Sequence, residues 1–196
     1  MKYYSLFSLL LIFASSQLFS QSNLQKEIGD DRNPRYGILG QTAPELEDLQ
    51  WVDVNGEPRD NIKLANLEGK FKVIYCFQAW CPGCHSRGLP ALKEMSMALA
   101  DNTAVEFMAI QTVFEGESSN TYSRMVDIQK QYDLAIPFAH DPGNEHSAHR
   151  SFTMNSYRTG GTPWFIFIDQ SGKVVFNDYH LDTEKAIAYL KTIESL

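Results

Sequence analysis

The sequence predicts an α/β fold with a mixed central sheet flanked by helices. Two compact apolar runs, at residues 71–77 and 105–113, have the length and the β-branched and aromatic content of strands buried on both faces. Helical spacing of apolar residues follows each run, and strands that alternate with helices pair in parallel through right-handed crossovers. Two more strands, joined by the turn from Asp169 to Gly172, close the chain and add antiparallel pairing.

The first 20 residues have the pattern of a cleaved secretory signal peptide. A basic residue, Lys2, precedes an apolar stretch at residues 6–14, and the small residue Ser20 precedes Gln21. The apolar stretch is shorter than the roughly 20 residues that a membrane span needs. We therefore expect residues 1–20 to be removed and the chain to be exported without stable membrane insertion. An N-terminal anchor that is not cleaved is the alternative.

A polar segment and a hairpin are expected ahead of the first buried strand. Residues 21–36 are polar, contain Asp-Asp-Arg-Asn-Pro-Arg, and predict a linker or a loose N-terminal arm. The domain itself is expected at residues 37–196. Within it, the turn signal Asn55-Gly56 favours a hairpin at residues 49–61.

Helices and strands alternate over the rest of the domain. Leu89, Leu92 and Leu99 share one face of a helix expected at residues 82–100, and Pro90 should kink this helix. The elements expected after the strand at 105–113 are a helix at 122–132, a strand at 136–141, a helix of about two turns at 144–154, two strands within 163–179 and a terminal helix at 182–196 capped by Asp182 or Thr183.

Charge and cysteine content exclude some classes of function. The net charge is −7 and the pI about 5.2, so the chain has no basic surface for a nucleic-acid backbone or an anionic membrane. Three cysteines are too few to form the disulfide framework of a domain of this size. Cys76 lies within an apolar strand and is expected to be a buried apolar residue. The spacing of Cys81 and Cys84 therefore carries the functional information.

Two cysteines separated by Pro82 and Gly83 allow three interpretations. A zinc site needs about four ligands, so the pair would have to recruit histidines. A structural disulfide across two residues closes a very small loop and removes little entropy from the unfolded chain. A redox pair is the third interpretation. The histidines available for a metal site are His85, His140, His146 and His149.

The position of the pair favours redox chemistry. Cys81 follows a strand and precedes a helix, so the unpaired N–H groups and the positive end of the helix dipole face its sulfur. Such an environment lowers a cysteine pKa from about 8.5 to between about 3.5 and 7.5. Cys84, one turn further into the helix, is expected to be more buried and to act as the resolving thiol.

Two segments resemble those of the thioredoxin-like oxidoreductases, and in particular the exported TlpA-type or redoxin-domain branch. Ala-Trp-Cys-Pro-Gly-Cys, residues 79–84, is similar to the Trp-Cys-x-x-Cys site of this family, and residues 160–176 are similar to its cis-proline loop and closing hairpin. The resemblance runs from about Gly40 to Leu196. It implies a thioredoxin-like fold in which residues 121–157 form the helix-strand insertion of this branch.

The resemblance also assigns roles to residues. It implies that Cys81 is the nucleophile, that Cys84 is the resolving cysteine, and that the two form a redox-active disulfide. Thr162 and Pro163 would form the loop beside this disulfide, with Pro163 in the cis form and the preceding backbone free to pair with a substrate. Trp80 would give the substrate an apolar face to contact. Neither a cofactor nor a resident metal is implied.

The chain departs from the family behind the disulfide. Many relatives carry a buried acidic residue there that relays the proton of the second cysteine. This chain has Tyr75 six residues before Cys81 and Arg87 three residues after Cys84, and neither can act as that base. Water, His85 or a distant carboxylate are the groups left for this role.

These observations predict a thiol:disulfide oxidoreductase. We expect it to exchange disulfides with exported protein substrates in the periplasm, across the inner membrane. The sequence does not fix the direction of electron flow, but the typical role of the resembled branch implies a reductant supplied by a membrane electron donor. One alternative is a thiol peroxidase of the peroxiredoxin type, although that branch has a threonine where this chain has Gln78. Another is a copper chaperone without enzyme activity that binds Cu(I) through Cys81, Cys84 and a histidine.

Overall fold

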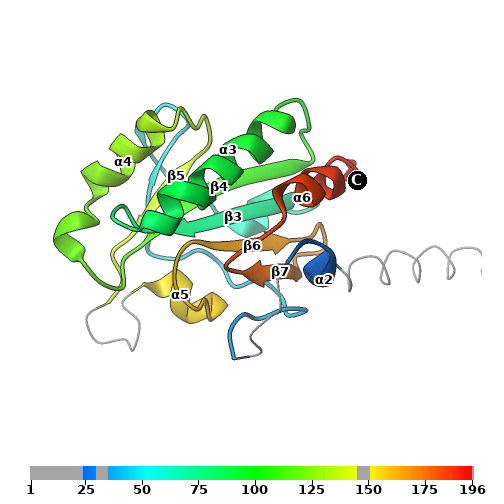
Figure 1. Ribbon diagram of the computed structural model, residues 1–196, viewed down its shortest axis with the longest axis horizontal. Helices are drawn as coiled ribbons and strands as arrows, with labels where there is room; N and C mark the ends of the chain where they lie inside the picture. The colour runs from blue at the N-terminus through cyan, green and yellow to red at the C-terminus, as the bar shows by residue number, and fades with distance from the viewer. Residues whose placement is uncertain (1–23, 30–34, 145–150, 196) are drawn as a thin grey trace, which may run out of the picture.

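A mixed sheet of seven strands forms the centre of the computed structural model, which describes residues 24–29, 35–144 and 151–195 (Figure 1). The strands stand in the order β2-β1-β5-β4-β3-β6-β7. Their bounds are β1 (Gln50–Val52), β2 (Pro58–Arg59), β3 (Phe71–Phe77), β4 (Val105–Thr112), β5 (Phe138–Asp141), β6 (Trp164–Ile168) and β7 (Val174–Asp178).

The pairing combines parallel and antiparallel strands as predicted. In the middle of the sheet, β4 runs parallel to both β3 and β5. The N-terminal hairpin of β1 and β2 joins the outer side of β5 in antiparallel pairing, and β6 and β7 extend the sheet from β3, again antiparallel. The predicted α/β fold, with a mixed sheet and a hairpin at each side, is therefore confirmed.

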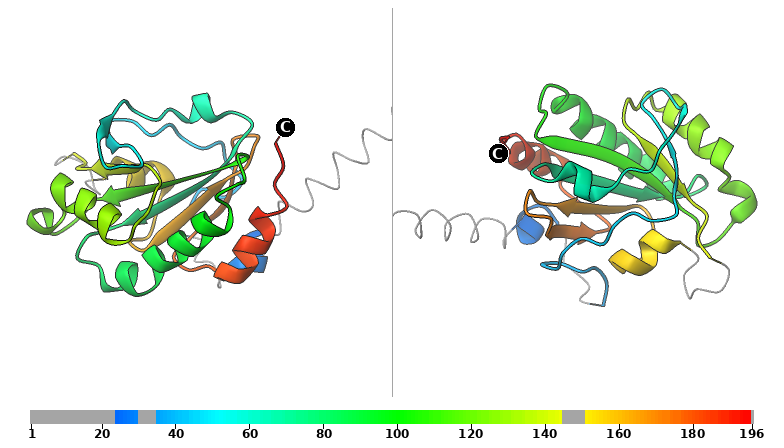
Figure 2. Two further views of the ribbon diagram at one scale, coloured as in Figure 1. Left: turned by 90° about the horizontal axis from the view of Figure 1, so that it is seen from above. Right: turned by 180° about the vertical axis from the view of Figure 1, so that it is seen from behind.

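Helices cover the two faces of this sheet unequally. The helices are α2 (Leu24–Ile28), α3 (Leu89–Ala98), α4 (Tyr122–Gln131), α5 (Phe152–Tyr157) and α6 (Thr183–Leu190), with short 3-10 turns at η1 (Leu64–Leu67) and η3 (Glu117–Ser119) and a π-helical turn at η2 (Cys84–Gly88). Helices α2, α3, α4 and α6 lie over one face, whereas α5 and the chain around residues 38–64 lie over the other (Figure 2). The buried side chains divide between two cores in the same way.

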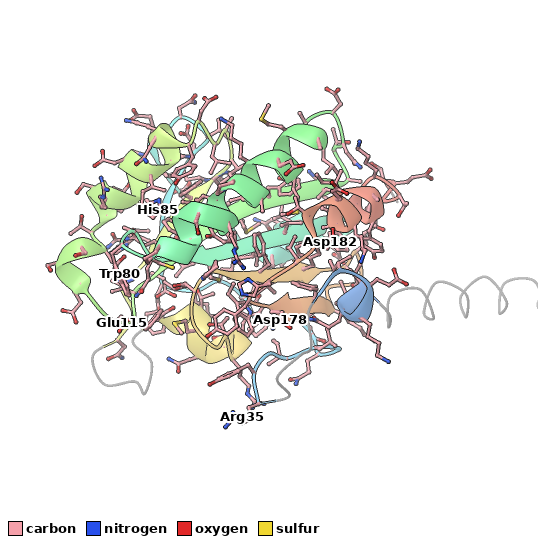
Figure 3. The ribbon with its side chains drawn as sticks, in the orientation of Figure 1. Arg35, Trp80, His85, Glu115, Asp178 and Asp182 are labelled. Carbon is pink, nitrogen blue, oxygen red and sulfur yellow. The ribbon has the colours of Figure 1, made fainter. Side chains whose placement is uncertain are left out.

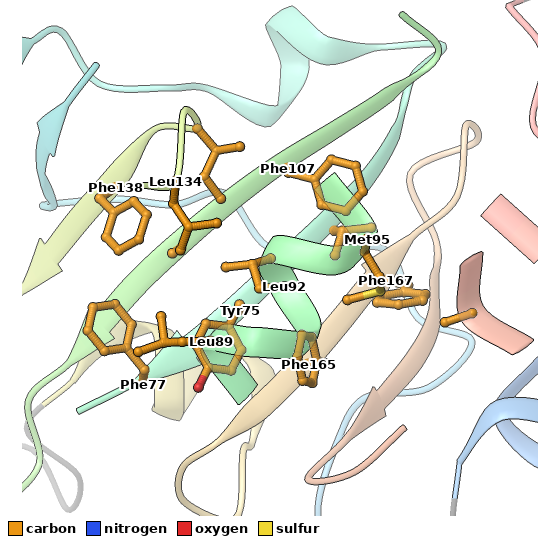
Figure 4. Close-up of a cluster of buried hydrophobic side chains, with 14 of the residues drawn as sticks. Tyr75, Phe77, Leu89, Leu92, Met95, Phe107, Leu134, Phe138, Phe165 and Phe167 are labelled. Carbon is orange, nitrogen blue, oxygen red and sulfur yellow. The ribbon is translucent and has the colours of Figure 1, made fainter. Parts of the chain in front are cut away.

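Strand β3 divides its side chains between two cores, because successive residues of a strand point to opposite faces. All seven of its residues are buried. Tyr75 and Phe77 belong to the core under α3, together with Leu89, Leu92 and Met95 (Figure 4). Cys76 belongs to the opposite core, beside α5. The sheet thus places Cys76 on the face away from the helix that follows the Cys-x-x-Cys pair.

The helix predicted at residues 82–100 is interrupted by a π-helical turn. Helical backbone begins at Pro82, η2 follows, and α3 ends at Ala98. The N–H of Leu89 donates to the carbonyl of Cys84, five residues back. Pro90 was expected to cause a kink, and the irregularity lies in the turn just before it, where a wider π turn accommodates a residue without an N–H.

Part of the segment predicted as a linker or loose arm is packed against the domain. Leu24 and Ile28 of α2 are fully buried. The side-chain amide of Gln25 donates to the carboxylate of Asp178 at 3.0 Å and accepts from the N–H of Asn177 at 2.9 Å. Residues 24–29 thus form an arm that is packed against β7 rather than a loose one.

Two other predictions extend beyond what the structure describes. The proposed signal peptide at residues 1–20 lies outside the described residues, as do His146 and His149. The helix expected at 144–154 is seen only as α5, which begins after Ser151; the Ser151 hydroxyl caps it by accepting from the N–H of Met154. None of the helices within residues 24–29, 35–144 and 151–195 is long and apolar enough to cross a membrane.

Candidate active site

Cys81 lies between the end of β3 and the first helical turn, as the sequence predicted. Its N–H donates to the carbonyl of Gln78, and its own carbonyl accepts from the N–H of Cys84. The N–H of Cys84 also lies 3.2 Å from the sulfur of Cys81. The N–H of Cys84, in the first turn of the helix, is therefore shared between the carbonyl and the sulfur of Cys81, and a donor at the sulfur stabilises a thiolate.

The Thr162-Pro163 loop lies directly beside this sulfur. The peptide bond between Thr162 and Pro163 is cis, and the carbonyl oxygen of Thr162 lies 3.6 Å from the sulfur of Cys81. A Cβ added to Gly83 would lie 3.2 Å from the Pro163 ring, so the helix start packs closely on the proline. Residues 81 positions apart in the sequence are thus brought into contact, as the resemblance implied.

The two sulfurs of the pair are chemically unequal. The pKa of Cys81 is lowered to about 6, chiefly by its hydrogen bond with the Cys84 thiol and further by Thr162 and the N–H groups of Gly83 and Cys84, against the opposing effect of burial. The pKa of Cys84 is raised, first by burial and then by its hydrogen bond with Cys81. Cys81 thus has the low pKa expected of a nucleophile and Cys84 the raised pKa expected of a resolving thiol, and these roles remain predictions.

Cys76 takes no part in the site. All three cysteines are free thiols in this structure. Cys76 is fully buried in the core beside α5, and burial raises its pKa far above the usual range. A thiol that remains protonated is not a nucleophile. The expectation of a buried apolar residue is confirmed.

Alkylation by iodoacetamide should follow the ionisation of Cys81 alone. Because only the thiolate reacts, the rate of the first modification should rise with pH, reach half its maximum near pH 6 and level off above pH 7. Cys84 should stay unmodified over this range, since its pKa is raised. The reduced protein is reacted at a series of pH values from 4 to 9, samples are quenched at successive times, and mass spectrometry measures the rates for both cysteines. A midpoint above pH 8 would contradict the assignment of Cys81 as the activated thiol.

Trp80 stands exposed beside Cys81 and is braced by the loop at residues 115–120. The side chain of Trp80 is 45% exposed. A Cβ on Gly116, which has a left-handed backbone, would lie 3.1 Å from the indole nitrogen. Figure 3 places Trp80, Glu115 and His85 at the same end of the molecule. The exposed indole gives the site the apolar face that the resemblance implied.

Asn120 fixes this loop to the strand end, and sequence reasoning missed it. Its side-chain oxygen accepts from the N–H of Ala79 at 2.7 Å, and its amide nitrogen donates to the carbonyls of Glu115 and Gly116. Gln78 donates to the same Glu115 carbonyl at 3.1 Å. The acidic side chains of the loop are exposed, as expected, but its backbone supports the active site.

His85 holds helix α4 against the strand end. Its Nε2 lies 2.7 Å from the carbonyl oxygen of Ala79, and its Nδ1 lies 2.9 Å from the hydroxyl of Tyr132. A carbonyl only accepts, so Nε2 carries the hydrogen and Nδ1 accepts from Tyr132 when the ring is neutral. Both ring nitrogens are therefore used to tie α4 to the site. Within the described residues, no group of three or more His, Cys, Asp or Glu side chains is placed to hold a metal ion.

Hydrogen bonds and ring contacts of two aromatic side chains hold the loop that carries Pro163. The hydroxyl of Tyr179 donates to the carbonyl of Gly160, and the indole N–H of Trp164 donates to the side-chain oxygen of Asn177. The rings of Trp164 and Tyr179 meet edge to face at 4.6 Å between centroids. These contacts fix the loop next to Cys81. That Trp80, Thr162 and Pro163 bind substrate remains a prediction.

A cavity of about 570 Å³ opens beside Pro163. It runs from Arg87 and Gly88 at the end of η2 to the N-terminal end of α6, and its walls include Tyr179 and His180.

Comparison with known proteins places this geometry in a family. Residues 39–192 match the sequence model of the redoxin family, described as Redoxin. The thiol-disulfide oxidoreductase ResA of Bacillus thuringiensis subsp. konkukian (strain 97-27) is 26% identical over 156 residues, which cover 79% of this chain and 78% of that protein. A nucleoredoxin of Arabidopsis thaliana is 27% identical over 147 residues, which cover 75% of this chain but only 22% of the length of the nucleoredoxin.

Solved structures show the same fold. A thioredoxin-like superfamily protein superimposes with a TM-score of 0.68 at 29% identity, covering 78% of this chain and 95% of that one. A thiol-disulfide isomerase from Corynebacterium glutamicum gives a TM-score of 0.66 at 28% identity, covering 79% of this chain and 97% of that one.

Proposed function

The chain belongs to the redoxin family and is a thiol-disulfide oxidoreductase, and from this premise we propose that it reduces disulfides of exported proteins through Cys81 and Cys84. The observation that carries the proposal is the inequality of the two sulfurs. One has a pKa of about 6 at the start of a helix, and the other is a buried neutral thiol one turn away.

The geometry supports a two-step exchange. The Cys81 thiolate attacks one sulfur of a substrate disulfide and forms a mixed disulfide, while the other substrate sulfur leaves as a thiolate. Cys84 then attacks the sulfur of Cys81, and the second substrate sulfur is released. Two electrons pass from the pair to the substrate, and Cys81 and Cys84 end as a disulfide. A membrane electron donor, the partner we propose, returns the pair to its thiol form.

The substrate is proposed to be a polypeptide in extended form. The carbonyl oxygen of Thr162 lies 3.6 Å from the sulfur of Cys81. The backbone of Thr162 can therefore form hydrogen bonds with an extended chain that is bonded to this sulfur. Trp80, which precedes Cys81 in the chain and is half exposed, offers apolar contact beside the nucleophile. Thr162, Pro163 and Trp80 thus form the proposed substrate-binding residues.

The reduction potential of the pair tests the direction of electron flow. Pairs of this chemistry range from about −270 mV for reductants to about −120 mV for oxidants, and we expect a value below about −180 mV. Equilibration with dithiothreitol or glutathione buffers, followed by alkylation and mass spectrometry, measures it. Reduction of insulin disulfides by the protein under dithiothreitol recycling gives the activity. A potential near −120 mV, or no reduction of insulin, would contradict a reductant.

Export is proposed from the N-terminal pattern of Lys2, an apolar stretch and Ser20. Expression of the full chain in a Gram-negative host, followed by N-terminal sequencing of the protein from the periplasmic fraction, tests it. A mature chain that begins near Gln21 is expected. Retention of Met1 on a cytoplasmic product would exclude export.

A further inference from the structure

We propose that the hydroxyl of Tyr75 donates a hydrogen bond to the sulfur of Cys84 and supports the negative charge that forms there in the second step of exchange. This inference rests on the function proposed above. It assigns a role to a buried group that the nucleophile does not touch.

Tyr75 reaches Cys84 from beneath the helix. Its side chain is fully buried on β3, and its ring packs against Phe165 at 4.8 Å and Phe77 at 5.9 Å between centroids (Figure 4). The hydroxyl lies 3.4 Å from the carbonyl oxygen of Cys84. That carbonyl already accepts from the N–H of Leu89. At 3.4 Å this bond lies at the long end of hydrogen-bond distance, so a small movement of the hydroxyl would exchange the carbonyl for the thiol of the same residue.

Gly88, which has no side chain, leaves room for this hydroxyl. A Cβ added to Gly88 would lie 2.0 Å from the hydroxyl oxygen of Tyr75 and 2.6 Å from the ring carbon that bears it. Gly88 therefore allows the phenol to rise to the level of the π-helical turn. The wider turn and the missing side chain together bring the hydroxyl to Cys84.

The chemistry of the second step needs such a donor. Cys84 starts as a thiol in the mixed disulfide, and its sulfur must carry negative charge as it attacks Cys81. Burial disfavours that charge and raises the pKa of Cys84, whereas the hydrogen bond with Tyr75 acts in the opposite sense. The pKa of Tyr75 is itself raised well above its usual value by burial, so the phenol keeps its proton and acts as a donor rather than a base.

The step balances without an external reagent. The Cys81-substrate disulfide and the Cys84 thiol become the Cys81–Cys84 disulfide and a substrate thiol. The bond between Cys81 and the substrate sulfur breaks, the bond between Cys81 and Cys84 forms, and the proton of Cys84 ends on the departing sulfur. Tyr75 is unchanged at the end.

Other titratable groups act on the same sulfur and must be kept constant. Cys81 lies on the same turn and is coupled to Cys84 through their hydrogen bond. Tyr132 on α4 also responds to charge on Cys84, although burial is the larger cause of its raised pKa. His85, beside Cys84 in the chain, is turned to Tyr132 and to the carbonyl of Ala79. The test therefore changes only the Tyr75 hydroxyl.

Stopped-flow reaction of the reduced protein with dithiobis(nitrobenzoate) separates the two steps. Attack by Cys81 releases the first thionitrobenzoate, and attack by Cys84 on the mixed disulfide releases the second. In Tyr75→Phe we expect the rate of the first release to stay within about twofold of the wild-type rate. The rate of the second release should fall by roughly tenfold, the size expected for a lost hydrogen bond to a charged group. The pH profile of the second release should also move to higher pH.

Tyr157→Phe is the matched control. Tyr157 is as buried as Tyr75, and its hydroxyl donates a hydrogen bond to the Pro44 carbonyl that the phenylalanine variant lacks. Tyr157 packs on the opposite face of the sheet, away from Cys84. Both releases should match the wild type in this variant. A fluorinated tyrosine at position 75, a stronger donor of nearly the same shape, should speed the second release and tests the proposal independently of any effect on folding.

The outcomes separate this inference from the function on which it rests. If the wild type gives two releases and Tyr75→Phe gives the second at the wild-type rate, the role of Tyr75 is refuted and the oxidoreductase stands. Equal slowing in Tyr157→Phe would mean general loosening and would also refute it. If the wild type releases only one thionitrobenzoate, the two-cysteine function fails, and the inference fails with it.

Discussion

Replacing Cys81 by serine should abolish the reduction of insulin, with a loss of roughly a thousandfold or more, because a serine hydroxyl is not ionised at neutral pH and is a weak nucleophile. With a pKa of about 6, most of the Cys81 sulfur is thiolate at pH 7. Serine has a similar size, so the fold should persist. The turbidity assay with insulin measures the loss, and thermal unfolding checks that the variant is folded.

Cys84→Ser should fail in a different way. The first attack remains possible because Cys81 keeps the N–H groups of the helix start, although its pKa will rise without the thiol of Cys84, which is the largest cause of its low value. The mixed disulfide can then no longer resolve. Electrophoresis without reducing agent should show a covalent adduct with a disulfide-containing substrate.

Cys76→Ala provides the control for both variants. Its sulfur lies in the opposite core and is not a nucleophile, so the rate of insulin reduction should be unchanged. Retention of wild-type activity in Cys81→Ser, or its loss in Cys76→Ala through chemistry rather than unfolding, would show that the nucleophile has been assigned to the wrong residue.

Gly88→Ala is the second change with a large expected effect, on stability rather than chemistry. Gly88 precedes α3 with ordinary helical angles, φ −65° and ψ −52°, so alanine alone would favour the helix by about 1 kcal/mol. The added Cβ would instead lie 2.0 Å from the Tyr75 hydroxyl and 2.6 Å from its ring. Both partners are buried and cannot move aside. Overpacking of this kind costs about 3 kcal/mol, which exceeds the gain in helix propensity, so Gly88→Ala should lower the free energy of unfolding.

A double-mutant cycle measures this contact directly. In a Tyr75→Leu background the phenol is absent, and Gly88→Ala should cost much less than in the wild type. Urea denaturation of the four proteins gives the free energies of unfolding. Equal costs in the two backgrounds would show that the loss comes from the turn itself and not from the contact with Tyr75.

The elements and residues that could be predicted are those with a strong local signal. Strand β3 is seven consecutive buried residues, and such a run is unmistakable in a sequence. The spacing of Cys81 and Cys84 allows three interpretations, and the position of the pair between a strand and a helix favours redox chemistry. Thr162 and Pro163 are distant in sequence, and only the resemblance of their segment to a known family placed them at the site.

The residues that could not be predicted depend on depth and packing. Tyr75 fits an apolar strand, and nothing in the sequence tells how far its hydroxyl reaches. Asn120 is one buried amide in a loop of polar residues, and its role depends on the N–H of Ala79, 41 positions away. Helix α2 has only five residues, too few for a periodic pattern, so the sequence does not reveal that Leu24, Gln25 and Ile28 are buried.

The placement of Cys76 on the far face of β3 has a consequence for how the protein should be handled. In the unfolded chain three thiols lie within residues 76–84, and any two of them can be oxidised to a pair. Once the sheet has formed, its strands lie between Cys76 and the other two cysteines. Renaturation under air should therefore trap scrambled isomers, whereas renaturation with excess thiol followed by gentle oxidation should yield a single one.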